Sequence, residues 1–119
     1  MSIRALVVAM ALLAAACGDD GGAAEPKSPI DTGADSTIVL EVIDGDLVGG
    51  SRQEDVSIGD SVEVIVSGDS DEQIHIHGYD LYVDLVDGSG STEFDALIPG
   101  TFEIELEGSG RLLIRMTVS

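Results

Sequence analysis

The sequence predicts an all-β fold, an antiparallel β-sandwich, over about residues 36 to 119. Two observations predict it: apolar and polar residues alternate in segment after segment, and turns rich in Gly and Asp separate the segments. No window has the apolar stripe and capping residues of an amphipathic helix. Short strands with one apolar face each must cover that face with a second sheet. We therefore expect two sheets around one modest core.

The strands are predicted from their period-two alternation. The first presents Ile38, Leu40 and Val42 on one face, and the last presents Leu112, Ile114, Met116 and Val118, with Leu113 on the opposite face. The alternating segments are 37–42, 61–67, 80–85, 101–107 and 111–118, and the turn sequences are 44–46, 58–60, 67–71, 87–91, 98–100 and 107–110. The glutamates at 103, 105 and 107 are interpreted as the solvated face of their strand.

The N-terminus is predicted to be an export signal. Arg4 precedes an apolar run from Ala5 to Ala16, which is shorter than the roughly 20 residues that span a bilayer. The sequence LAAAC, which ends at Cys17, resembles the lipobox of bacterial lipoproteins, in which the cysteine becomes the lipidated N-terminal residue. An ordinary secreted protein cleaved at the same place is the alternative. Cys17 is the single cysteine, so it has no intrachain disulfide partner, and lipidation accounts for it.

This interpretation divides the chain into three parts: a signal peptide at 1–16, the lipidated Cys17 with a flexible acidic linker to residue 35, and a folded domain at 36–119. The linker is rich in Gly, Ala, Asp and Pro and has no hydrophobic periodicity. We expect the protein to be exported and held on the outer face of a membrane by its lipid.

The charge restricts the possible partners. The chain has 23 acidic and 5 basic residues, for a formal net charge of −18 at pH 7. Phosphates would be repelled, so no nucleic-acid partner is expected. Adsorption to anionic lipid is excluded in the same way. Membrane attachment is then expected through the lipid, with another envelope protein as a further candidate partner.

The stretch from about Val56 to Val118 resembles the cupredoxin-like domains of exported bacterial proteins. The resemblance rests on the histidine segment QIHIHGYD at 73–80 and on the run STEFDALIPGTFEIELE, which ends at Glu107. It implies a Greek-key β-sandwich, in agreement with the strand pattern. In redox members of the family a Cys, a second His and often a Met near the end of the chain hold copper. Here Leu106 occupies the Cys region and Gly110 or Arg111 the His region, so a blue-copper electron carrier is excluded.

The two histidines of the chain lie two positions apart, at His75 and His77. In a strand, residues i and i+2 point to the same face, so both imidazoles are expected on one side. Two such rings can chelate a divalent ion, and Cu(II) is favoured by the general order of affinities. A nearby carboxylate, Asp80, Asp71 or Glu72, is expected to complete the site. Alternatively, both histidines are surface or packing residues hydrogen-bonded to neighbouring turns.

Other chemistries receive little support. The acidic turns 44–46 and 69–72 are too short for an EF-hand calcium loop and are typical turn sequences. No serine lies in a Gly-x-Ser-x-Gly motif, and no enzymatic activity is expected. Two functions remain: a tethered module that binds Cu(II) or another divalent metal without redox turnover, or a metal-free module that docks on another envelope protein.

Overall fold

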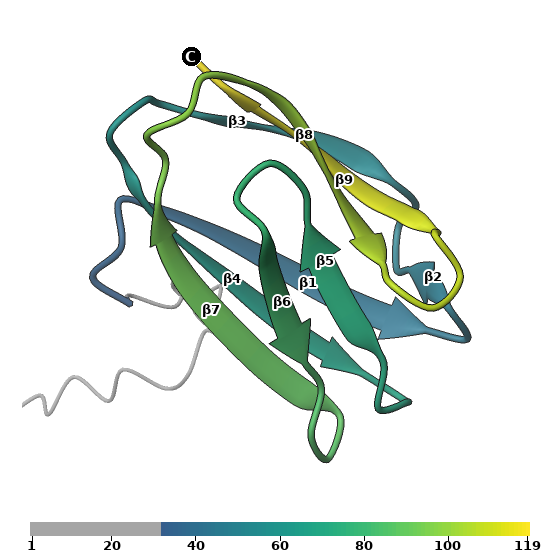
Figure 1. The fold of residues 1–119 in the computed structure, drawn as a ribbon. Coiled ribbons are helices and arrows are strands. Elements are labelled where there is room, and N and C mark those ends of the chain that lie inside the picture. The colour runs from purple at the N-terminus through teal and green to yellow at the C-terminus, as the bar shows by residue number, and fades with distance from the viewer. Residues whose placement is uncertain (1–31) are drawn as a thin grey trace, which may run out of the picture.

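The computed structural model describes residues 32–119, which form nine β-strands and no helix (Figure 1). The strands are β1 (Ser36–Ile43), β2 (Asp46–Leu47), β3 (Arg52–Val56), β4 (Ser61–Gly68), β5 (Gln73–Ile76), β6 (Leu81–Asp84), β7 (Ser89–Asp95), β8 (Gly100–Leu106) and β9 (Leu112–Val118). The predicted signal, Cys17 and most of the predicted linker lie outside the described residues. Over 32–119 there is no helix with the length and apolarity to cross a membrane.

The strands form two sheets that face each other, as Figure 1 shows. One has the order β2-β1-β4-β7 and the other the order β3-β9-β8-β5-β6. The predicted β-sandwich is confirmed. Both sheets are mixed rather than purely antiparallel, because β1 pairs with β4, and β3 with β9, in parallel. The chain between β1 and β4 contributes β3 to the opposite sheet, and such a crossover allows a strand to return in the same direction.

The core lies between the sheets and is entirely apolar among the described residues. Its members alternate along each strand, as the period-two pattern predicted. The buried residues are Ile38, Leu40, Val42, Leu47, Val56, Val62, Val64, Val66, Ile74, Ile76, Val83, Leu85, Ala96, Ile104, Leu106, Leu113, Ile114, Met116 and Val118. Since Ile74 and Ile76 are fully buried, the alternate residues of β5 point away from the core.

The alternation fails at one point in β9. Leu113, expected on the outer face, is fully buried together with Ile114. The register between β8 and β9 shifts here, because Ile104 pairs with Ile114 whereas Glu105 pairs with Leu112. Leu113 is therefore an extra residue opposite its partner strand, which is the arrangement of a β-bulge. The bulge lies directly beside Glu105, and bulges in general increase the local twist of a sheet.

The N-terminal boundary of the sandwich is fixed by Asp35. Its carboxylate accepts hydrogen bonds from the backbone N–H of Ser61, at 3.0 Å, and from the Ser61 hydroxyl, at 3.2 Å. The backbone N–H of Asp35 donates in return to the Ser61 Oγ at 3.0 Å. The chain is thus attached to the start of β4 one residue before β1 begins.

Candidate metal centre

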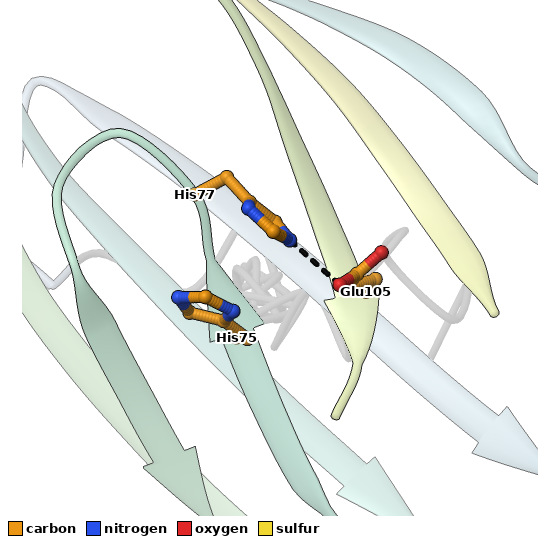
Figure 2. Close-up of side chains that lie close together, drawn as sticks. All are labelled: His75, His77 and Glu105. Carbon is orange, nitrogen blue, oxygen red and sulfur yellow. Dashed lines mark hydrogen bonds and ion pairs between the residues drawn. The ribbon is translucent and has the colours of Figure 1, made fainter. Parts of the chain in front are cut away.

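Three side chains converge on the outer face of the five-stranded sheet. His75, His77 and Glu105 each offer one ligand atom, and these atoms all lie within 4.8 Å of one another. Figure 2 shows the two imidazoles beside each other on the β5 side, with the Glu105 carboxylate facing them from β8. All three residues are partly buried. The cluster is therefore open to solvent on one side and supported by the sheet on the other.

Strand pairing explains why these residues meet. His75 pairs directly with Glu105 across the antiparallel β5–β8 ladder. His77 follows the end of β5, and its backbone N–H donates to the carbonyl of Glu103 at 2.9 Å, which keeps it alongside β8. Directly opposite and diagonal side chains on one sheet face lie close enough to interact. His75 on β5 and His77 just beyond its end therefore lie close to Glu105 on β8.

An imidazole–carboxylate contact already joins two of the ligands. The His77 Nε2 and the Glu105 Oε1 are 2.6 Å apart. A metal ion binds imidazole nitrogen and carboxylate oxygen at about 2.0 to 2.2 Å, so two ligands of one ion are up to about 4 Å apart. The three donor atoms, all within 4.8 Å of one another, are close to that range. An ion would replace the short His77–Glu105 contact.

His75 is enclosed on three sides. Its Nδ1 lies 3.2 Å from the Oε2 of Glu107, and its Nε2 lies 3.8 Å from the Oδ1 of Asp80. Its ring stacks on that of Tyr82, the residue with which it pairs on β6, with centroids 4.3 Å apart and planes at 6°. The side chain is only 15% exposed, compared with 42% for His77. His75 is consequently the more restrained of the two rings.

The environment of the site is anionic. Every ion-pair contact of the two histidines is made to a carboxylate, that of Asp80, Glu105 or Glu107. Desolvation, followed by the negative charges of Glu107 and Asp80, raises the pKa of Tyr82 above its ordinary value of 10.0. The negative charges of Glu107 and Asp80, which contribute to this shift after desolvation, also attract a cation to the same place.

The turn after His77 is fixed by packing. Gly78 has a φ of 83°, and a Cβ there would overlap the ring of Phe102. Tyr79 packs against Phe102 and Phe94, with centroids 5.1 and 4.7 Å away. Its hydroxyl donates to the carbonyl of Ile98 at 2.7 Å and accepts the Ile98 N–H at 3.1 Å. The turn that carries His77 is therefore held to the β7–β8 connection.

The structure brings together His75 and His77, as the strand pattern predicted. The carboxylate of the three-residue group is Glu105, whereas Asp80, 90% exposed, is not a member of it, and neither is Asp71 or Glu72. Glu105 was not predicted as a ligand, because the glutamate row was interpreted as a solvated face. What identifies Glu105 is the pairing of β8 with β5, the strand of the two histidines. The alternation of apolar and polar residues does not reveal which strands pair.

Met116 shares the apolar face of its strand with Ile114 and Val118, a position that favours a core residue over a metal ligand. Met116 is fully buried in the core with Ile114 and Val118, on the opposite side of the sheet from the histidines. Its interpretation as a core residue rather than a ligand is confirmed.

Comparison with known proteins gives a fold but no family. No family model and no curated protein matches the chain. Among solved structures, a copper binding protein in its apo form, determined by NMR, aligns with a TM-score of 0.56 and 16% identity over 70% of this chain and 86% of that one. A heme-copper terminal oxidase dimer, determined by cryo-electron microscopy, aligns with a TM-score of 0.54 and 15% identity, over 80% of this chain and 76% of that one. The predicted β-sandwich fold is thus shared with these two structures.

Proposed function

We propose that this domain binds a divalent transition metal ion, with Cu(II) as the preferred ion, through His75, His77 and Glu105. The observation that carries the proposal is that one ligand atom from each of these residues lies within 4.8 Å of the others. The apo copper binding protein with a similar fold is a second line of support, limited to the fold.

The donor set fits copper in its divalent state. Imidazole nitrogens suit Zn, Cu, Fe and Ni, and among first-row divalent ions the affinity of a given site is highest for Cu(II). One carboxylate beside two imidazoles leaves further coordination positions for water or for Glu107, whose Oε2 lies 3.2 Å from the His75 Nδ1. When bound, the metal would supply a site for exchangeable ligands, held by the three side chains.

The proposal extends to location and role. The lipobox-like sequence that ends at Cys17 supports an exported protein, anchored by lipid to the outer face of a membrane. The negative charge of the chain supports the collection of cations and argues against nucleic-acid partners. The proposed role is to hold or hand over metal at that surface, without catalytic turnover.

Calorimetric titration of Cu(II) into the full chain tests this proposal. The chain should carry Cys17→Ser, so that no thiol contributes to binding. We expect one Cu(II) per chain. Each of His75→Ala, His77→Ala and Glu105→Gln should lower the affinity by at least about 10-fold, because loss of a mere outer-shell partner of a ligand already costs about 10- to 100-fold. Glu93→Gln removes the same charge from an exposed position on β7, in the other sheet, and should bind as the parent does.

The result that would overturn the proposal is equal affinity in the parent and in both histidine variants. Acid provides an independent check, because protons compete with metal for imidazole nitrogen. Binding at about pH 5 should be much weaker than at about pH 7.5, since an imidazole nitrogen that holds a proton has no lone pair for the metal. Circular dichroism of each variant shows whether the sandwich is retained.

A second candidate function is a metal-free interaction module. Leu97 and Ile98, in the β7–β8 connection, are 67% and 46% exposed, and the Ile98 backbone is held by Tyr79 beside the histidine turn. These two neighbouring apolar side chains offer a contact point for a protein partner. Chemical crosslinking in the native envelope, with Leu97→Ser as the comparison, tests it. A partner that is lost in this variant and retained in His77→Ala would support this candidate function over metal binding.

A further inference from the structure

Soft sulfur donors do not reach the histidine cluster. Within residues 32–119 the one sulfur-containing side chain is Met116. It is fully buried in the core, whereas His75 and His77 lie on the outer face of the sheet. All donors available to the site from the described residues are therefore nitrogen and oxygen. Thiolate and thioether ligands select Cu(I), and their absence from this set removes that preference.

The carboxylates around the site favour the higher charge state of copper. Glu105 lies 2.6 Å from His77, and Glu107 lies 3.2 Å from His75. The attraction between a carboxylate and an ion is proportional to the charge of the ion, so Cu(II) gains twice as much as Cu(I) from each. Glu105 is only 20% exposed, so water screens its charge incompletely. The field of the site thus distinguishes the two oxidation states.

The relative position of the two imidazole rings also distinguishes Cu(II) from Cu(I). The centroids of His75 and His77 are 4.2 Å apart, with planes at 38°. Cu(I) bound by two imidazoles favours a linear arrangement with the ion between the two rings. The two metal–nitrogen bonds then span about 4 Å. The ring centroids lie farther apart still, because each is set back from its nitrogen by the radius of its ring. Rings side by side instead provide adjacent positions of the tetragonal geometry that Cu(II) adopts. The Tyr82 stack and the Glu107 contact hold His75 in this position.

From these three features we infer that the site is selective for oxidation state: it retains Cu(II) and releases copper on reduction to Cu(I). The inference rests on the proposed metal binding. A one-electron donor from outside the protein, such as ascorbate, reduces Cu(II) to Cu(I). The copper–nitrogen and copper–oxygen bonds then break, the Cu(I) passes to a soft ligand in solution, and the short His77–Glu105 contact forms again.

The test compares retention of two ions by the full chain with Cys17→Ser. The protein is loaded with Cu(II) or with Zn(II), which ascorbate does not reduce, and is ultrafiltered without oxygen before and after ascorbate is added. A small-molecule thioether serves as the soft acceptor. We expect copper in the filtrate only after ascorbate, and Zn(II) retained throughout. In separate chelator competitions, the affinity for Cu(I) should be weaker than that for Cu(II) by more than about tenfold.

Glu105→Gln tests the electrostatic cause. This variant keeps both imidazoles and removes one negative charge, so it should lose affinity for Cu(II) by roughly tenfold or more and affinity for Cu(I) much less. Glu93→Gln, in the opposite sheet, should change neither.

The outcomes separate the two proposals. If copper stays on the protein after reduction, with equal affinity for the two states, the inference is overturned while metal binding stands. The inference is overturned in the same way if Glu105→Gln weakens both states equally. If the parent chain binds neither Cu(II) nor Zn(II), the proposed function fails, and the inference fails with it.

Discussion

The imidazole of His75 lies almost parallel to the phenol ring of Tyr82, with ring centroids 4.3 Å apart and planes at 6°. The two residues pair directly across β5 and β6. Stacked aromatic pairs contribute about 0.5 to 1.5 kcal/mol beyond the area that they bury. The stack therefore restricts the orientation of the ring that we propose as a metal ligand.

The first prediction is that Tyr82→Ala weakens Cu(II) binding by about tenfold, because His75 gains rotational freedom that binding must remove. Tyr82→Phe keeps the ring and should retain most of the affinity. Titration of both variants with Cu(II) measures the difference. Equal affinity in Tyr82→Ala and in the parent chain would show that the stack does not position His75.

The second prediction concerns the ionisation of Tyr82. Desolvation and the charges of Glu107 and Asp80 raise its pKa, so the folded chain keeps the phenol proton at a pH at which the unfolded chain has lost it. The resulting stabilisation is present below about pH 10 and is lost as the pH rises through the higher folded pKa. Glu107→Gln should lower this pKa part of the way, because desolvation remains.

Ultraviolet absorbance of the phenolate measures this ionisation. The difference between the parent chain and Tyr82→Phe isolates Tyr82 from Tyr79, the second tyrosine of the chain. Glu93→Gln on β7 provides the charge-matched control. A Tyr82 titration that is unmoved by Glu107→Gln would mean that this carboxylate does not act on the ring.

The sequence predicted the segments with several buried residues and missed the strands β3 and β7, which have one or none. β1 and β4 present buried residues at every second position, which a period-two pattern detects. β7 contains no fully buried residue, and β3 buries only Val56. β3 and β7 are edge strands that bury little apolar surface, so neither leaves a clear alternation in the sequence. Their positions are set by backbone hydrogen bonds to β4 and β9.

The site was predicted in part for a related reason. The spacing of His75 and His77 is a local property, and it correctly placed both rings on one face. The position of the third member, Glu105, depends on the register of β5 against β8 and on the adjacent bulge. The register pairs residues some 30 positions apart in the sequence, such as His75 and Glu105. Asp80 was favoured because it is near in sequence, but it adopts a φ of 53° at the end of the turn and stays exposed.

The third prediction is that Cu(II) produces no intense blue absorption and no reversible copper couple. Blue colour requires a cysteine thiolate ligand. Residues 32–119 contain no cysteine. Visible spectroscopy and voltammetry of the loaded Cys17→Ser chain test this directly. A strong charge-transfer band would show a ligand set other than His75, His77 and Glu105.

The fourth prediction concerns Cys17. If this residue is lipidated after cleavage of the signal, Cys17→Ser should move the protein from the membrane fraction to the soluble fraction. Fractionation of expressing cells, followed by detection with an antibody to the domain, measures the change. Mass spectrometry of the parent protein should find lipid on Cys17. A variant that remains in the membrane fraction would rule out this residue as the anchor.

The last prediction is that Gly78→Ala destabilises the fold and weakens the metal site together. The left-handed conformation of Gly78, with φ of 83°, costs an alanine about 1 to 2 kcal/mol. The added Cβ also overlaps the ring of Phe102, and overpacking of this kind costs about 1 to 3 kcal/mol. The backbone must shift to relieve the overlap, and His77 is the adjacent residue. We therefore expect a loss of about 2 to 5 kcal/mol in the free energy of unfolding, measured by urea denaturation.

Gly108→Ala is the matched control, because a Cβ added at Gly108 would meet no atom within 4 Å and the φ of this residue is not in the left-handed range. It should change neither stability nor Cu(II) affinity appreciably. In Gly78→Ala, Cu(II) affinity measured under conditions where the variant is still folded should fall, since the displaced His77 no longer faces Glu105. Loss of stability with unchanged affinity would mean that the turn relaxes away from the site and that the position of His77 depends on its backbone bond to Glu103 alone.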